Sequence, residues 1–300
     1  MMRLLMVILS MAGLVLMASP SVGWAAEGPG MGEAHAMPLR PEDVANVGGL
    51  PITNSMLLTW IVAAALILCA HIATRRLKAV PSGFQNFWEW MIEGLYNFLE
   101  GIIGNELARK TFWFFATIFI FILSLNWSGL IPGVGTIGWG EWSRHGFEVT
   151  KPVFRGANAD LNMTFAMAMV FFVCWLIWAL QYNGLKGFLL HLFGPKGETK
   201  GLMRWLLMVV FAAIGVLEVV SILFRPVSLS FRLYGNIFAG ESMLDAMAKL
   251  VPYLNWLLPV PFYFMELLVG LAQALVFMLL TAVFTLLICI HDDDPVQKRH

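Results

Sequence analysis

The sequence predicts an all-α polytopic membrane protein, with about five membrane-embedded helices and one amphipathic helix at the interface. Hydrophobic residues make up 59% of the 300 residues and charged residues only 13%, and the mean hydropathy is +0.76. Soluble proteins carry about 25% charged residues. The apolar residues fall in runs long enough to cross a bilayer core that is about 30 Å thick. The formal net charge of zero gives no case for a nucleic-acid partner.

Residues 1–25 have the pattern of a secretory signal peptide. Arg3 precedes an apolar core at residues 4–18, and Gly23-Trp-Ala25 supplies small residues before a cleavage point. An uncleaved anchor helix is the alternative, although the apolar core is short for a span of about 20 residues. Residues 26–54 lack helical periodicity, and we expect them to form an external N-terminal tail.

A single membrane domain is expected over residues 55–291. Its first span, residues 55–74, ends in the basic cluster Arg75-Arg76-Leu77-Lys78, which marks the cytoplasmic side by the positive-inside rule. The mature N-terminus is therefore predicted outside the cell. Five spans then leave residues 292–300 as a cytoplasmic tail. Lysine and arginine are more numerous in the segments assigned to the cytoplasm than in the external ones, which agrees with this orientation.

Residues 82–104 are predicted to form an amphipathic helix at the cytoplasmic interface. Their apolar residues recur at helical spacing, and acidic and amide side chains occupy the opposite face. Ser82 and Gln85 have the spacing of a capping box, which would start this helix. We expect the helix to have a structural role.

Two further spans are predicted at residues 111–130 and 160–182, joined by an external polar loop. Asp160 and Asn162 open the second of these spans at the outer edge of the membrane. Two interpretations of Asp160 remain open. It stabilises a helix N-terminus, or it lines a polar path together with Asn162.

The last two helices, at about residues 205–250 and 261–290, are predicted to be unusually long. As one helix, residues 205–250 would extend for about 69 Å, more than twice the thickness of a bilayer core. We therefore expect this segment to tilt strongly, bend or contain two helical pieces, with Pro226 as the natural position of a kink.

Arg232 lies deep within the first of these helices. An ionisable side chain at the centre of a membrane helix costs about 2.5 to 3.5 kcal/mol on insertion scales, so it needs a partner. Asn236 shares its side of the helix, and Glu241 lies further toward the outside. Antiparallel alignment of the two helices brings Gln273 to the depth of Asn236 and Arg232. It also brings Glu266 to the depth of Glu241.

Glu218 and Arg225 precede Arg232 at intervals of seven residues. On a continuous helix the three side chains would project from nearly one face. Glu218 and Arg225 either belong to a polar path toward the cytoplasm or form a stabilising pair. Together with the outer carboxylates, the set indicates two polar half-paths separated by a fixed positive charge.

At these residues the sequence resembles the a subunit of F-type ATP synthases. The similarity is strongest in Ser-Leu-Ser-Phe-Arg232-Leu-Tyr-Gly-Asn236-Ile-Phe-Ala-Gly-Glu241 and in Glu266-Leu-Leu-Val-Gly-Leu-Ala-Gln273-Ala. It extends over about residues 55–290, with weaker matches at residues 81–87, 126–133 and 159–164. Some members of the family have histidine where this chain has Glu266, so its proton relay is expected to titrate differently.

The resemblance implies a stator proton-channel subunit of the ATP synthase membrane sector in a bacterial inner membrane. Two half-channels and Arg232, as the essential coupling arginine, would couple proton movement to rotation of the c-ring, against which the last two helices would lie as a tilted hairpin. The implied proton-pathway residues are Glu218, Asn236, Glu241, Glu266, Gln273, Asp160 and Asn162, with Arg225 in a secondary, structural role. The implied partners are the c-subunit ring, b-type peripheral stalk subunits, the remaining ATP synthase subunits and the lipid membrane. The subunit would be non-catalytic and would hold no cofactor or metal.

The alternative class is a proton-pump subunit of a respiratory complex, an ion-coupled transporter or a polytopic membrane enzyme. Such proteins should show histidine ligands or a nucleophile set within their spans, or internal repeats. We find no internal repeat, and the histidines that could serve lie near predicted membrane edges: His71, His191 and His291. The cysteines lie singly in apolar runs, and we interpret them as core residues: Cys69, Cys174 and Cys289.

Overall fold

The structure is a computed structural model, and it describes residues 43–47, 50–75, 78, 80–135, 137–143, 146–193, 202–250, 253–254 and 256–289. Its helices are α2 (Asn54–Thr74), α3 (Phe84–Ile103), α4 (Asn105–Gly129), α5 (Leu161–Phe193), α6 (Leu202–Leu250) and α7 (Pro259–Cys289), with a short 3-10 turn, η1, at Ala157–Ala159. The predicted all-α membrane fold is therefore confirmed. The predicted signal peptide and cytoplasmic tail lie outside the described residues.

Short strands accompany the helices on the segments predicted to be external. Strand β1 (Asp43–Val47) pairs antiparallel with β2 (Leu50–Thr53), immediately before α2. Between α4 and α5, β3 (Pro132–Gly135) is followed by the antiparallel pair of β4 (Gly138–Ser143) and β5 (Gly146–Pro152). The polar loop thus contains a hairpin that the sequence analysis did not anticipate.

Among the described residues, five helices are long and apolar enough to cross a membrane. The candidate spans are Asn54–Thr74, Asn105–Gly129, Leu161–Phe188, Val210–Ala248 and Pro259–Cys289. Helix α3 is the described helix outside this group, as expected of an amphipathic interfacial segment. The number of spans agrees with the sequence prediction.

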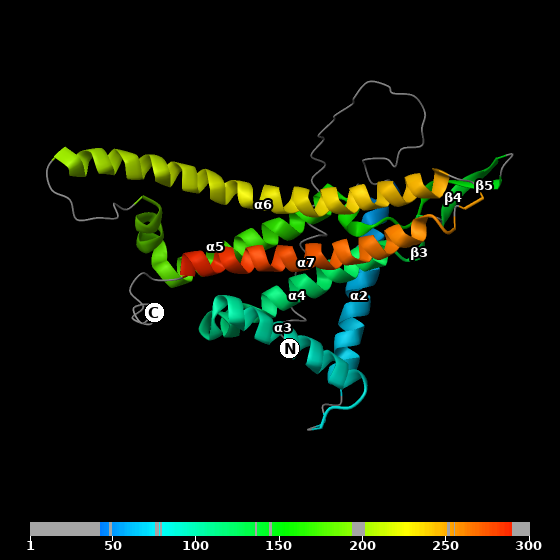
Figure 1. The fold of residues 1–300 in the computed structure, drawn as a ribbon, viewed down its shortest axis with the longest axis horizontal. Helices are drawn as coiled ribbons and strands as arrows, with labels where there is room; N and C mark the ends of the chain where they lie inside the picture. Colours follow the sequence, from blue (N-terminus) through cyan, green and yellow to red (C-terminus); the bar gives the residue numbers. More distant parts are fainter. Residues whose placement is uncertain are drawn as a thin grey trace, which may run out of the picture.

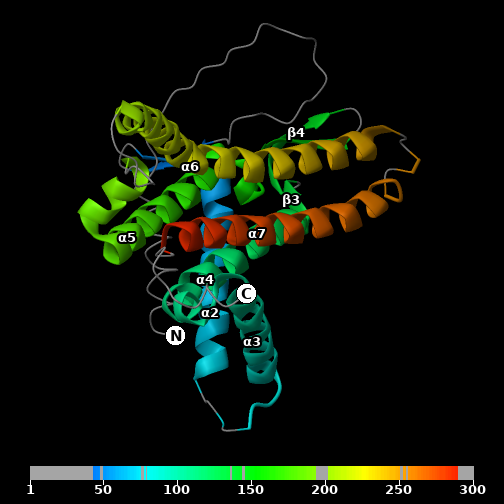
Figure 2. The same ribbon diagram turned by 60° about the vertical axis from the view of Figure 1, so that its left-hand side comes forward.

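Helices α6 and α7, of 49 and 31 residues, lie side by side and antiparallel, and both run steeply across the direction of α2 (Figures 1 and 2). Helix α5 packs against α6, and α4 packs against α7. Helix α6 continues through Pro226 as one helix, so the segment is not divided into two helical pieces. Helix α5 instead changes direction at Gly184, whose backbone is non-helical.

The core lies where α4, α5 and α7 meet, and large aromatic side chains fill it. Phe114, Phe171, Trp175 and Phe277 are almost completely buried. The indole Nε1 of Trp175 also donates to the backbone oxygen of Phe284 at 3.1 Å, which ties α5 to α7. In lipid such a bond matters because water cannot satisfy the donor.

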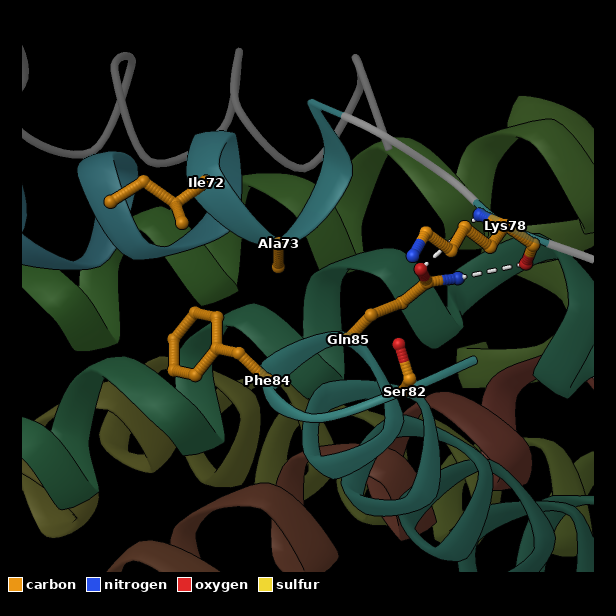
Figure 3. Close-up of a pocket in the computed structure, with 6 residues that line it drawn as sticks. All are labelled: Ile72, Ala73, Lys78, Ser82, Phe84 and Gln85. Atoms are coloured by element: carbon orange, nitrogen blue, oxygen red, sulfur yellow. Dashed lines mark hydrogen bonds between the residues drawn. The ribbon is translucent and has the colours of Figure 1, made fainter. Parts of the chain in front are cut away.

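Helix α3 begins at Phe84, so the predicted capping box is wrong. Its N-cap is Gly83, and no side chain caps the helix. The oxygen and the nitrogen of the Gln85 side-chain amide instead both bind the backbone of Lys78. The Lys78 N–H donates to Oε1 at 3.2 Å, and Nε2 donates to the Lys78 oxygen at 3.1 Å (Figure 3). Gln85 therefore fixes the connection between α2 and α3. A cavity of about 200 Å³ at this connection is lined by Ile72, Ala73, Lys78, Ser82, Phe84 and Gln85.

Gly104 joins α3 to α4 with φ 79° and ψ 159°, a region that glycine alone occupies readily. We predict that Gly104→Ala lowers the free energy of unfolding by about 1 to 3 kcal/mol. Gly101→Ala is the matched control, because neither position has a heavy atom within 4 Å of an added Cβ and Gly101 is helical. The control should raise stability by up to about 1 kcal/mol. Unfolding in SDS, followed by circular dichroism, compares the two variants, and equal stability would contradict the prediction.

Candidate functional site

The antiparallel packing of α6 and α7 brings Asn236 and Gln273 into contact. The amide Nδ2 of Asn236 donates to Oε1 of Gln273 at 2.7 Å. Gln273 is buried, whereas Asn236 is exposed. The two amides are therefore at the same depth, as the spacing of polar residues along the two helices predicts.

Two carboxylates lie further along the same hairpin. The carboxylate of Glu266 occupies the space beside Gly240, where a Cβ would collide with it, so it lies close to the residue that precedes Glu241. The two acids are near enough to interact electrostatically. Oε1 of Glu266 and Oε2 of Glu241 are buried and have no hydrogen-bond partner among the described residues. A buried oxygen without a donor is costly, and protonation of either carboxyl group would reduce that cost.

The segment between β5 and α5 is buried in the protein and packs against this site. Residues 155–160 are all buried, although residues up to 159 were predicted to belong to an external polar loop. The carboxylate of Glu241 packs against Gly156, at a position that a Cβ would fill. Arg155 is 6% exposed and interacts electrostatically with Glu241 and Asp160. The sequence analysis assigned no site role to Arg155 or Gly156. The run of small residues before Asp160 is the signal that could have found this segment.

Asp160 lies immediately before α5 and connects it to α2. Ser55 Oγ donates to Oδ2 of Asp160 at 2.7 Å, and the Asn162 N–H donates to Oδ1 at 2.9 Å. This geometry fits the interpretation in which Asp160 stabilises the start of a helix. Burial raises the pKa of Asp160, while the bond from Ser55, the N–H of Asn162 and the charge of Arg155 oppose that shift. The side chain of Asn162 itself is exposed at the same end of α5.

A chain of amides links the buried loop to α7. Nδ2 of Asn158 donates to Oδ1 of Asn126 at 2.6 Å, and Nδ2 of Asn126 donates to the backbone oxygen of Gly270 at 2.9 Å. The Trp127 indole donates to the Leu267 oxygen at 3.2 Å. These bonds hold the turn of α7 that follows Glu266. The sequence analysis singled out this part of α4 only as a weak family match.

Arg225 and Arg232 on α6 have different surroundings. Nη2 of Arg225 donates to Oε1 of Glu218 at 2.9 Å, and its guanidinium lies over the rings of Phe284 and Trp175, 4.4 and 5.7 Å from their centroids. Arg232 is exposed and makes no hydrogen bond or ion pair with another residue in the described part of the chain. The seven-residue spacing therefore does not give the two side chains one environment.

Acids with buried oxygens, paired amides and an exposed arginine on two long helices of a multi-pass protein are features of an ion-conducting membrane subunit. The profile of the family described as "ATP synthase A chain" matches residues 56–285. The ATP synthase subunit a of Moorella thermoacetica is 33% identical over 246 residues, which cover 82% of this chain and 95% of that protein. The corresponding protein of Geobacter sulfurreducens is 33% identical over 246 residues, covering 82% and 90%. ATP synthase subunit a 3 of Pelobacter propionicus is 36% identical over 226 residues, covering 75% and 83%.

The chain belongs to the ATP synthase subunit a family. It is a multi-pass membrane subunit of the F-type ATP synthase and serves as the proton channel of the stator in the membrane sector. This assignment replaces the alternative classes of respiratory pump subunit, transporter and membrane enzyme.

The contact between Asn236 and Gln273 leads to a prediction that does not depend on the function of the protein. In a background without Cys69, Cys174 and Cys289, the pair Asn236→Cys and Gln273→Cys should crosslink with a short thiol reagent in most molecules. The pair Gly235→Cys and Gln273→Cys is the matched control, because neighbouring helix positions project about 100° apart. Mass spectrometry of the linked peptides measures the yield. Similar yields from the two pairs would contradict this register.

Proposed function

We propose that Arg232 is the coupling arginine between two half-channels, and that the face of the α6–α7 hairpin that carries it lies against a rotating ring of small subunits, each with one carboxylate. The observation that carries this proposal is the contrast between Arg225 and Arg232. Arg225 has its counter-charge within the chain, whereas Arg232 is exposed in the middle of a candidate span and makes no ion pair among the described residues. A guanidinium facing lipid is costly, so a carboxylate from another subunit is its natural partner.

The surroundings of Arg232 support a protein partner. Large apolar side chains are exposed on both helices of the hairpin: Leu217, Leu223, Phe224 and Phe231 on α6, and Phe264 and Leu268 on α7. An apolar face with one positive charge in it suits apolar hairpin subunits that each present one carboxylate. The c-ring would be this partner. The b-type peripheral stalk subunits and the other ATP synthase subunits would hold the chain in place while the ring turns.

The outer half-channel would be formed by the acids and amides of the hairpin. Glu241 and Glu266 would take up protons and pass them inward along Gln273 and Asn236. Two features support this order: the buried, unsatisfied carboxylate oxygens, and the bond between the amides at the depth of Arg232. We also propose that Asp160, with Asn162 beside it, belongs to the mouth of this path, because Asp160 shares the electrostatic surroundings of Glu241 through Arg155.

The inner half-channel would lie toward the start of α6. Glu218 is half-exposed and its position is held by Arg225. The ion pair favours a stabilising role for Arg225, with Glu218 left accessible to protons leaving for the cytoplasm. This assignment places the two half-channels on opposite sides of Arg232.

The proposed cycle follows from the cost of charge in lipid. A ring carboxylate would remain protonated while it faces lipid, because an ionised group is strongly disfavoured there. Beside Arg232 it would ionise, since guanidinium stays charged even when partly buried. The proton would leave by the inner path, and the outer path would supply the next one. The membrane potential contributes about 2.3 kcal/mol per charge per 100 mV.

The same proposal covers orientation and chemistry. The mature N-terminus would be external and the C-terminus cytoplasmic, in a bacterial inner membrane, because the basic cluster that begins at Arg75 follows the first span. ATP would be made on other subunits, so this chain would be non-catalytic.

We predict that Arg232→Ala abolishes proton-driven ATP synthesis, a loss of at least about 100-fold, while the detached soluble part still hydrolyses ATP. Arg232→Lys should also lose most coupled turnover, because ammonium loses its proton more readily when desolvated and lacks the planar fork of guanidinium. Arg225→Ala is the comparison and should be milder when equal amounts of assembled complex are compared. ATP-driven proton pumping in inverted vesicles measures all three. Pumping at the normal rate by Arg232→Ala would refute the assignment.

A further inference from the structure

Among the arginines whose burial the structure describes, Arg155 is the most deeply buried, at 6% exposed. It lies in the segment between β5 and η1, which was predicted to belong to an external polar loop. A buried guanidinium is retained in a protein where it meets negative charge. The charged and titratable groups near Arg155 therefore indicate its role.

The groups around Arg155 belong to the outer half of the proposed proton path. Asp160 before α5, and Tyr234 and Glu241 on α6, all interact electrostatically with Arg155. Glu266 on α7 also interacts electrostatically with Glu241. The carboxylate of Glu241 packs against Gly156, the next residue after Arg155. The backbone therefore keeps Arg155 and Glu241 near each other.

We propose that Arg155 is a positioning residue of the outer path, which holds the Glu241 carboxylate against the loop at Gly156 and sets how tightly the outer acids bind protons. Arg155 and Arg232 would then stand at the two ends of the acid pair. The positive charge of Arg155 favours the ionised form of the Glu241 carboxylate. This inference rests on the proposed role of Glu241 and adds a residue that carries no proton itself.

The test is the dependence of ATP synthesis on external pH, at constant internal pH and constant proton-motive force, in right-side-out vesicles. Removing the positive charge in Arg155→Gln makes the outer carboxylates hold protons more tightly. The external pH at which the rate is half-maximal on the alkaline side should therefore rise by about one pH unit, and the maximal rate should fall. Arg155→Lys keeps the charge and should retain most of the wild-type profile. Arg75→Gln, which removes an exposed charge at the other end of α2, should leave the profile unchanged.

A double variant keeps the test independent of folding losses. In a Glu241→Gln background, Arg155→Gln should shift the profile much less, because the carboxylate on which Arg155 acts has been removed. A shift below about 0.2 pH unit for Arg155→Gln, or an equal shift in both backgrounds, would overturn the inference. If Glu241→Gln slows synthesis while Arg155→Gln has no effect on the profile, the outer path stands and this inference alone fails. If Glu241→Gln has no effect, the proposed path itself is wrong.

Discussion

The cost of placing a positive charge in a membrane is the constraint on which the rest of this structure depends. Arg225 is stabilised within the chain by its ion pair with Glu218 and by contacts with two aromatic rings. Arg232 has no such stabilisation among the described residues, and its side chain is exposed among apolar neighbours. A carboxylate on a neighbouring subunit is the partner that we propose for Arg232. Under this proposal, a ring subunit that moves past Arg232 exchanges its proton there.

The arrangement of the long helices supports the proposed proton path. Inclination of α6 and α7 relative to α2 (Figure 1) lets each helix present several polar positions at successive depths. Gly156 leaves room for the carboxylate of Glu241, and Gly240 leaves room for that of Glu266. A Cβ at either glycine would occupy the same space as the carboxylate. The bonds from Asn126 and Trp127 to backbone oxygens of α7 hold the turn beyond Glu266 in place. The same few contacts thus pack the helices together and position the polar side chains.

The pairing of polar residues on α6 and α7 could be predicted from the sequence, because few alignments of two long apolar helices place their isolated polar residues together. The contact of Asn236 with Gln273 follows from that reasoning. The burial of Arg155 could not be predicted in this way, since an irregular polar loop has no periodicity to show which side faces the protein. Gln85 has the spacing of a capping box, but spacing cannot show that its amide binds the Lys78 backbone. Likewise, the seven-residue interval between Arg225 and Arg232 fixes a helix face without fixing which neighbours each side chain reaches.

The central claim is that two separate polar paths reach Arg232 from opposite sides of the membrane. Its most direct test is the sidedness of thiol access in a background without native cysteines. A membrane-impermeant thiol reagent should block proton flux in Glu266→Cys only from the external side, and in Glu218→Cys only from the cytoplasmic side. Residual flux in each variant before labelling provides the reference. Access to both positions from the same side would show one continuous path and would contradict the account.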